Sequence, residues 1–131
     1  MPHIREYIAK KEWMGRRYAE ELSGIRGLRL PITKDYATNV YWMYAVLVEE
    51  PFGMSKDALR MKLADKGVDT RDFFYPCHSQ PFLRTHPQAK ASFPITEDIA
   101  QRGFYLPSGL ALTEEQLTIV CNAVREIAQQ V

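Results

Sequence analysis

The stretch from Val40 to Val48 constrains the fold more than any other part of the chain. Its sequence, Val-Tyr-Trp-Met-Tyr-Ala-Val-Leu-Val, is rich in β-branched and aromatic residues, which favour extended strands. The run is almost continuously apolar, and this pattern is typical of a strand that is covered on both faces. We therefore expect a central strand here, within a sheet that other elements must cover.

Helical periodicity marks both ends of the chain. Apolar residues recur at helical spacing over 3–23, and Gly24 is expected to end this first helix. Near the other end, Thr113 and Gln116 match a capping box, which opens a predicted helix over 114–129. Two amphipathic helices are therefore available to cover the sheet.

The middle of the chain supplies shorter elements. Ser55 is a typical N-cap for a helix over 56–66, and Thr96 for a helix over 97–102. Short strands are expected at 28–32, 68–71 and 104–106, and irregular structure at 36–39, 82–90 and 107–109. The order α-β-β-α-β-α-β-α predicts a two-layer α+β fold, a small mixed or antiparallel sheet packed by helices. At 131 residues we expect a single domain over 1–131.

Composition excludes several classes of function. The net charge of +1 gives no bulk electrostatic reason to expect binding to nucleic acid or a membrane surface. Cys77 and Cys121 form neither a disulfide framework nor a metal-binding spacing, which suits a reducing compartment. The first residues do not resemble a signal peptide, and no apolar run has the length of a membrane span. A cytoplasmic protein with no metal site is therefore expected.

The stretch from Gly67 to Pro81 is the most informative one for function. It places an arginine, three aromatic residues, a histidine and two prolines within a short span. Pro76 and Pro81 each fix φ and remove a backbone donor, so they stiffen the segment. A stiff loop that carries polar groups with apolar bodies is typical of a loop that presents side chains to a ligand.

Six separated blocks of the chain resemble one family, the DegT/StrS-type sugar aminotransferases, and within it the perosamine synthetases. The blocks are Asn39-Val-Tyr-Trp-Met-Tyr44, Gly67-Val-Asp-Thr-Arg71, Phe74-Tyr-Pro-Cys-His78 with Gln80-Pro81, Phe93-Pro-Ile-Thr-Glu-Asp-Ile-Ala100, Leu106-Pro-Ser-Gly109 and Leu112-Thr-Glu-Glu115. The resemblance covers essentially the whole chain and matches the carboxy-terminal small domain of those enzymes.

The resemblance implies an enzyme that uses pyridoxal phosphate (PLP) to transfer an amino group to a nucleotide-linked sugar, as a homodimer. In those enzymes a large domain carries the Schiff-base lysine and most cofactor contacts, and PLP chemistry depends on those groups. None of that domain is expected in these 131 residues, and none of their lysines sits in a matching motif. We therefore expect this chain to hold no cofactor and to be inactive alone.

Five residues are candidate substrate contacts by resemblance: Asn39, Arg71, Tyr75, His78 and Ser108. A guanidinium at Arg71 suits phosphate or carboxylate, although a surface salt bridge with a neighbouring aspartate is an alternative. Tyr75 and His78 could face a sugar, or His78 could make a structural hydrogen bond. Asn39 could instead be a turn residue. No catalytic residue is predicted.

Two further features of the sequence are interpreted as structural. Tyr41, Trp42 and Tyr44 are expected in the core rather than against a ligand. Cys77 precedes His78, but neighbours in sequence usually point apart, so a catalytic thiolate pair is not expected.

Three hypotheses of function remain open. The chain could be a detached small domain that is inactive alone, or one subunit of a split enzyme whose large domain is supplied in trans. It could also be a stand-alone module that binds a nucleotide sugar or another small anion. Homodimerisation is plausible in each case, because a small domain without its partner exposes apolar surface.

Overall fold

A computed structural model describes residues 2–83, 85–87 and 91–131. Four α-helices occur in these residues: α1 (Ile4–Leu22), α2 (Lys56–Asp65), α3 (Pro94–Arg102) and α4 (Glu114–Ala128). The strands are β1 (Leu28–Arg29), β2 (Tyr44–Val48), β3 (Arg71–Asp72) and β4 (Gly103–Leu106), and short 3-10 turns lie at Glu50–Phe52, Cys77–Ser79 and Pro81–Leu83. The predicted order of helices and strands is confirmed, and so is the α+β class.

The four strands form one antiparallel sheet in the order β1-β2-β4-β3. Tyr44 lies opposite Leu106 and Val46 opposite Phe104, so these four side chains share one face of the sheet. The prediction of a central strand is confirmed, because β2 pairs with both β1 and β4.

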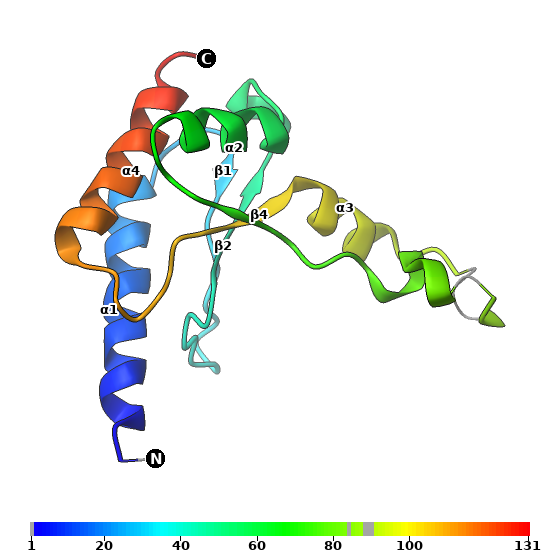
Figure 1. Ribbon diagram of the computed structural model, residues 1–131, viewed down its shortest axis with the longest axis horizontal. Coiled ribbons are helices and arrows are strands. Elements are labelled where there is room, and N and C mark those ends of the chain that lie inside the picture. Colours follow the sequence, from blue (N-terminus) through cyan, green and yellow to red (C-terminus); the bar gives the residue numbers. More distant parts are fainter. Residues whose placement is uncertain (1, 84, 88–90) are drawn as a thin grey trace.

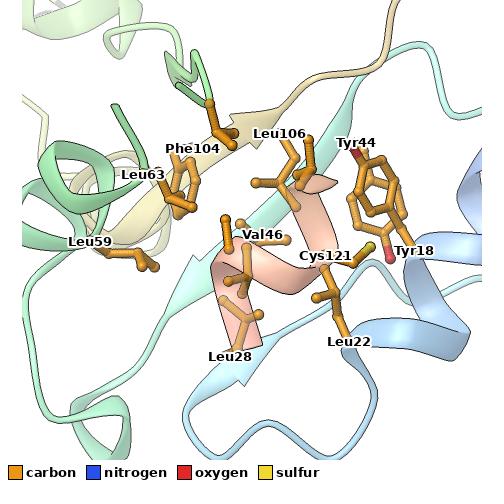
Figure 2. Close-up of a cluster of buried hydrophobic side chains, with 14 of the residues drawn as sticks. Tyr18, Leu22, Leu28, Tyr44, Val46, Leu59, Leu63, Phe104, Leu106 and Cys121 are labelled. Atoms are coloured by element: carbon orange, nitrogen blue, oxygen red, sulfur yellow. The ribbon is translucent and has the colours of Figure 1, made fainter. Parts of the chain in front are cut away.

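The core lies between this face and three helices. Figure 1 shows α1 and α4 side by side along the sheet, with α2 covering its upper end. Figure 2 shows how α1 contributes Tyr18 and Leu22, α2 contributes Leu59 and Leu63, and α4 contributes Cys121. Burial of such side chains contributes about 1.5–3 kcal/mol each, so this layer provides most of the stability of the fold.

The prediction that β2 is covered on both faces differs from the structure at the second face of the sheet. Burial alternates along β2: Tyr44, Val46 and Val48 are buried, whereas Ala45 and Leu47 are only half-buried. This alternation is typical of an antiparallel sheet packed on one face. Among the described helices, α3 lies against the other face, near β2 and β4.

Several predicted boundaries are wrong. The strand predicted from Val40 begins at Tyr44, because Tyr41 has a φ of 46°, which lies outside the extended region. The strand predicted over 28–32 is limited to β1, and the strand predicted over 68–71 is shifted to β3, which shares only Arg71 with the predicted range. Thr96 does not cap α3, which begins at Pro94, since proline is well suited to the first helical turn.

Other local predictions are confirmed. Ser55 caps α2 by accepting a hydrogen bond from the backbone of Ala58, and Thr113 and Gln116 form the predicted capping box of α4. The segment predicted as irregular over 82–90 begins within a short 3-10 turn and lies partly outside the described residues.

Residues 73–98, called the arm below, differ from the rest of the molecule, called the body. Figure 1 shows the arm leaving the sheet after β3, projecting away from the body and returning through α3. No described residue of the arm is buried, and several of its aromatic side chains are more than two-thirds exposed (Phe74, Tyr75 and Phe82).

Candidate functional site

A groove of about 540 Å³ lies where the ends of several elements meet. Lys11 of α1, Trp42 and Met43 before β2, Arg71 of β3, and the segment 105–110 contribute to its lining. The groove therefore combines cationic, aromatic and backbone groups from parts of the chain that are distant in sequence.

Arg71 is the cation available to a ligand in this groove. It lies opposite Tyr105 in the β3–β4 register, and its side chain is exposed. Within the described part of the chain it makes no ion pair and no side-chain hydrogen bond. The alternative of a salt bridge with Asp69 or Asp72 is therefore not formed.

The side chain of Asp72 instead lies on the opposite face of the sheet from that of Arg71, where it contacts α2. Its carboxylate accepts hydrogen bonds from Lys56 Nζ at 2.7 Å and from Arg60 Nη1 at 2.5 Å. Partial burial acts to raise the pKa of this carboxyl, but the two cations of α2 outweigh it and hold the pKa below its usual range. Asp72 thus ties β3 to α2 and does not pair with Arg71; Asp69, which also lines the groove, forms no ion pair with Arg71 either.

Lys11 holds two walls of the groove together. Its ammonium donates one hydrogen bond to the carbonyl oxygen of Trp42 at 2.8 Å and another to the carbonyl oxygen of Ser108. Partial burial lowers the pKa of this amine. Lys11 was not among the predicted site residues, although it lies four and seven residues before the buried Gly15 and Tyr18, and hence on the buried side of α1.

Ser108 lines the groove and is buried, with its hydroxyl 4.0 Å from the sulfur of Met43. The preceding carbonyl, that of Pro107, accepts a hydrogen bond from the Tyr18 hydroxyl at 2.7 Å. Since α1 therefore holds this segment at two consecutive carbonyls, the position of Ser108 is set by the body of the protein.

Asn39 does not line the groove. Its side-chain oxygen accepts a hydrogen bond from the backbone N–H of Tyr41 at 2.9 Å, which is the turn role considered as the alternative. The Tyr41 ring packs on Gly15 of α1 so closely that a Cβ at Gly15 would lie 2.5 Å from a ring carbon. Asn39 and Gly15 thus position the segment that carries Trp42.

Tyr75 and His78 lie in the arm, away from the lining of the groove. The ring of Tyr75 is 74% exposed. His78 Nε2 lies 3.0 Å from a carboxylate oxygen of Glu97, and its ring packs at 4.9 Å from that of Phe93. The structure thus brings Arg71 and Ser108 together, whereas His78 makes the structural hydrogen bond considered as its alternative.

The three aromatic residues predicted to be in the core have different environments. Tyr44 is buried and Tyr41 packs against the core, but Trp42 is 66% exposed and lines the groove. The prediction for Trp42 is wrong because the chain turns at Tyr41, so Trp42 precedes the strand rather than belonging to it. Sequence reasoning also missed Tyr105, which lines the same groove.

The described lysines do not fit the Schiff-base position of a PLP site. Lys11 alone among them lines the groove, and its ammonium is engaged by two carbonyls. Lys34 lies exposed in a loop. The other described lysines contact partners away from the groove: Lys10 contacts Trp13, Lys56 contacts Asp72, Lys62 contacts Gln130 and Lys66 contacts Glu126. Lys90 is outside the described residues. We therefore derive no cofactor chemistry from this chain.

The described residues contain neither a metal site nor a helix that could span a membrane. No cluster of three or more His, Cys, Asp or Glu side chains there could hold a metal ion. Among the helices described, none has both the length and the apolar character needed to cross a bilayer. Cys77 is exposed and Cys121 is buried, and neither forms a disulfide.

Comparisons with known proteins agree with the resemblance in sequence. Residues 1–125 match the family model of the DegT/DnrJ/EryC1/StrS aminotransferases. GDP-perosamine synthase of Vibrio cholerae is 26% identical over 125 residues, which are 95% of this chain and 34% of that protein. GDP-perosamine synthase of Escherichia coli O157:H7 is 36% identical over 88 residues, or 67% of this chain and 23% of that protein.

Solved structures show the same fold. DesV of S. venezuelae, determined in complex with a ketimine intermediate, matches with a TM-score of 0.88 and 28% identity, over 99% of this chain and 34% of its own. DesI, determined with its TDP-sugar product, matches with a TM-score of 0.86 and 27% identity, over 98% of this chain and 33% of its own. The chain spans about a third of the length of these relatives, corresponding to their carboxy-terminal portion. The chain belongs to the DegT/DnrJ/EryC1/StrS family of PLP-dependent sugar aminotransferases.

Proposed function

We propose that this chain is the small domain of a nucleotide-sugar aminotransferase and supplies one wall of its substrate site. The observation that carries the proposal is Arg71, an exposed guanidinium without an ion pair, in a groove that also contains Trp42 and Ser108. A guanidinium presents a planar set of donors that matches phosphate oxygens. The products named for two relatives, GDP-perosamine and a TDP-sugar, carry such phosphates.

The proposal divides the work of the enzyme between two parts. The groove would bind and orient the nucleotide sugar through Arg71, with Ser108 available to a sugar hydroxyl. The cofactor PLP would supply the amino-transfer chemistry and would be held by a lysine outside residues 1–131. Tyr75 and His78 stay candidate contacts, since the arm that carries them is exposed and its aromatic side chains are uncovered.

Calorimetry with a GDP- or TDP-linked sugar tests the role of the groove. We expect binding in the millimolar range that is weakened about tenfold or more by Arg71→Ala, because a charge-assisted hydrogen bond contributes about 1.5–3 kcal/mol. Arg26→Ala is the matched control, since Arg26 is also exposed but lies in the loop after α1, near a different hollow. Equal loss of affinity in both variants, or no binding at all, would contradict the proposal.

Treatment with PLP and borohydride tests the expected inactivity of residues 1–131 alone. Because the described lysines do not fit a Schiff-base site, we expect no stoichiometric adduct at any single lysine and no amino transfer. A single lysine modified in proportion to the protein would refute this part of the proposal.

A split enzyme is the second candidate, and the second face of the sheet, which is only partly covered by α3, favours it. A hollow of about 490 Å³ on this face is lined by apolar side chains that include Ile32 and Ile95, which are 66% and 75% exposed. A lysine-bearing large domain would cover this surface, in the same chain or in trans. Co-expression with such a domain is expected to give a complex with aminotransferase activity.

If instead the chain binds a nucleotide sugar but forms no complex, a stand-alone binding module is supported. Homodimerisation can be measured in the same preparations by light scattering.

A further inference from the structure

Two aromatic rings stand beside Arg71 and are not explained by the fold. Trp42 and Phe74 come from different segments, and their rings are nearly parallel, with centroids 6.4 Å apart and an angle of 10° between the planes. They remain 66% and 71% exposed, so their contact covers only a small part of either ring. Large apolar side chains left in this state offer their surface to another group.

The rings and the cation lie next to one another. Phe74 contacts the edge of Tyr105 with ring centroids 6.3 Å apart, and Tyr105 lies opposite Arg71 in the strand register. Tyr105 also lines both the groove and a smaller hollow of about 220 Å³ that includes Phe74. A continuous surface thus runs from the guanidinium of Arg71 across Tyr105 to the two parallel rings.

The body holds this arrangement in place. The carbonyl oxygen of Trp42 accepts a hydrogen bond from Lys11, so α1 fixes the backbone position of Trp42 at the edge of the groove. On the other side, the Phe73 ring stacks on Tyr105 with centroids 4.5 Å apart, which anchors the residue before Phe74. Both rings therefore extend from backbone that is attached to the sheet or to α1.

We propose that Trp42 and Phe74 form a stacking platform for the base of a nucleoside diphosphate whose phosphates bind Arg71. This inference rests on the proposed function and names the part of the substrate that these residues select. A nucleobase is planar and stacks on aromatic side chains, and its diphosphate requires a cation nearby. A polypeptide would cover the rings equally well, but it would give no reason for an exposed arginine that forms no ion pair within the described part of the chain.

The test separates the base from the phosphates. Binding of GDP, dTDP and inorganic pyrophosphate to the protein is measured by calorimetry for the wild type, Trp42→Ala, Phe74→Ala and Arg71→Ala. Each aromatic replacement is expected to weaken the nucleotides about 5- to 150-fold, the range that corresponds to one stacked base, and to leave pyrophosphate unchanged. Arg71→Ala is expected to weaken all three. Trp42→Phe, which keeps a ring, should restore most of the affinity for the nucleotides.

Matched controls and a spectroscopic signal accompany this test. Phe82→Ala removes an equally exposed aromatic of the arm that lines no part of the groove, and it should change none of the affinities. The chain has two tryptophans, so in Trp13→Phe the fluorescence comes from Trp42 alone, and the nucleotides but not pyrophosphate should quench it.

The outcomes distinguish this inference from the function on which it rests. If Arg71→Ala weakens the nucleotides but Trp42→Ala and Phe74→Ala do not, the stacking platform is refuted and the proposed function stands. If the aromatic variants weaken pyrophosphate as much as the nucleotides, the rings act on the structure of the groove, and the platform is again refuted. If no nucleotide binds at millimolar concentration, both proposals fail.

Discussion

The body and the arm of this protein are built in opposite ways. In the body, 19 apolar residues are buried together between one face of the sheet and three helices. In the described arm no residue is buried, and its fold depends on a few contacts such as that of His78 with Glu97. The body therefore sets the geometry of the groove, whereas the arm presents side chains that the body does not enclose.

The largest expected effect comes from the core of the body. Phe104→Ala should lower the free energy of unfolding by about 3–5 kcal/mol, because Phe104 is fully buried and its loss leaves a cavity under the sheet. Urea denaturation followed by circular dichroism measures the change. The matched variant in the arm, Phe82→Ala, should change it by less than about 0.5 kcal/mol, because that ring is 78% exposed. Similar losses in the two variants would remove the distinction between body and arm.

The junction of the two regions should show an intermediate effect. In Gly103→Ala the new methyl group would lie 2.3 Å from the Phe73 ring and 2.7 Å from the carbonyl oxygen of Ile99. Since the carbonyl belongs to the backbone of α3, the clash forces the arm to shift, and we expect a loss of about 1–3 kcal/mol.

Urea denaturation and hydrogen exchange in the arm measure the effect of this replacement. Gly109→Ala is the control, because no atom lies within 4 Å of its added methyl group. Gly103→Ala with unchanged stability and unchanged exchange would show that the arm is not anchored at this glycine.

The smallest effect is expected within the arm itself and depends on pH. The backbone N–H of Phe93 donates to Glu97 and is the main reason that the pKa of this carboxyl is lowered; burial opposes the shift, and His78 adds to it. A group with a lowered pKa in the folded state contributes stability above its unfolded pKa and loses that contribution as pH falls through the folded value. Protection of the Phe93 amide from exchange should therefore decrease at acid pH, as the pH falls below the ordinary pKa of a glutamate and through the lowered pKa of Glu97.

Amide exchange at several pH values checks this prediction. In Glu97→Gln the side chain can still accept the hydrogen bond from Phe93, but it no longer titrates, so the dependence on pH should disappear. The midpoint of global unfolding should barely change, because the body does not depend on this pair. A loss of protection at acid pH that persists in Glu97→Gln would assign the effect to another group.

Sequence patterns predicted the body well because they report burial. The helical periodicity of α1 and α4, the capping residues Ser55 and Thr113, and the position of β2 at the centre of the sheet all follow from local rules. The patterns failed where one residue overrides its neighbours. The left-handed φ of Tyr41 delays the start of the strand to Tyr44, so Trp42 precedes the strand and lies at the surface rather than in the expected core.

The candidate site was predicted only in part. Arg71 and Ser108 stand out in the sequence and lie in the same groove, but Lys11, Trp42 and Tyr105 do not stand out, and all three line it. In the sequence, Lys11 is not distinguished from the other polar residues of an amphipathic helix. Its function in the structure depends on two carbonyls that lie 31 and 97 residues away in the sequence.

By itself, the sequence determined the family, the order of helices and strands, and the buried face of each helix, because these depend on periodic burial and on local capping. The tertiary structure alone decided which charges were paired. Asp72 turns to α2 because alternate residues of a strand face opposite sides of the sheet, and Arg71 therefore faces the groove unpaired with Asp72. Antiparallel pairing of β3 with β4 places that arginine beside Tyr105, and the hydrogen bond from Lys11 helps to hold Trp42 at the edge of the groove.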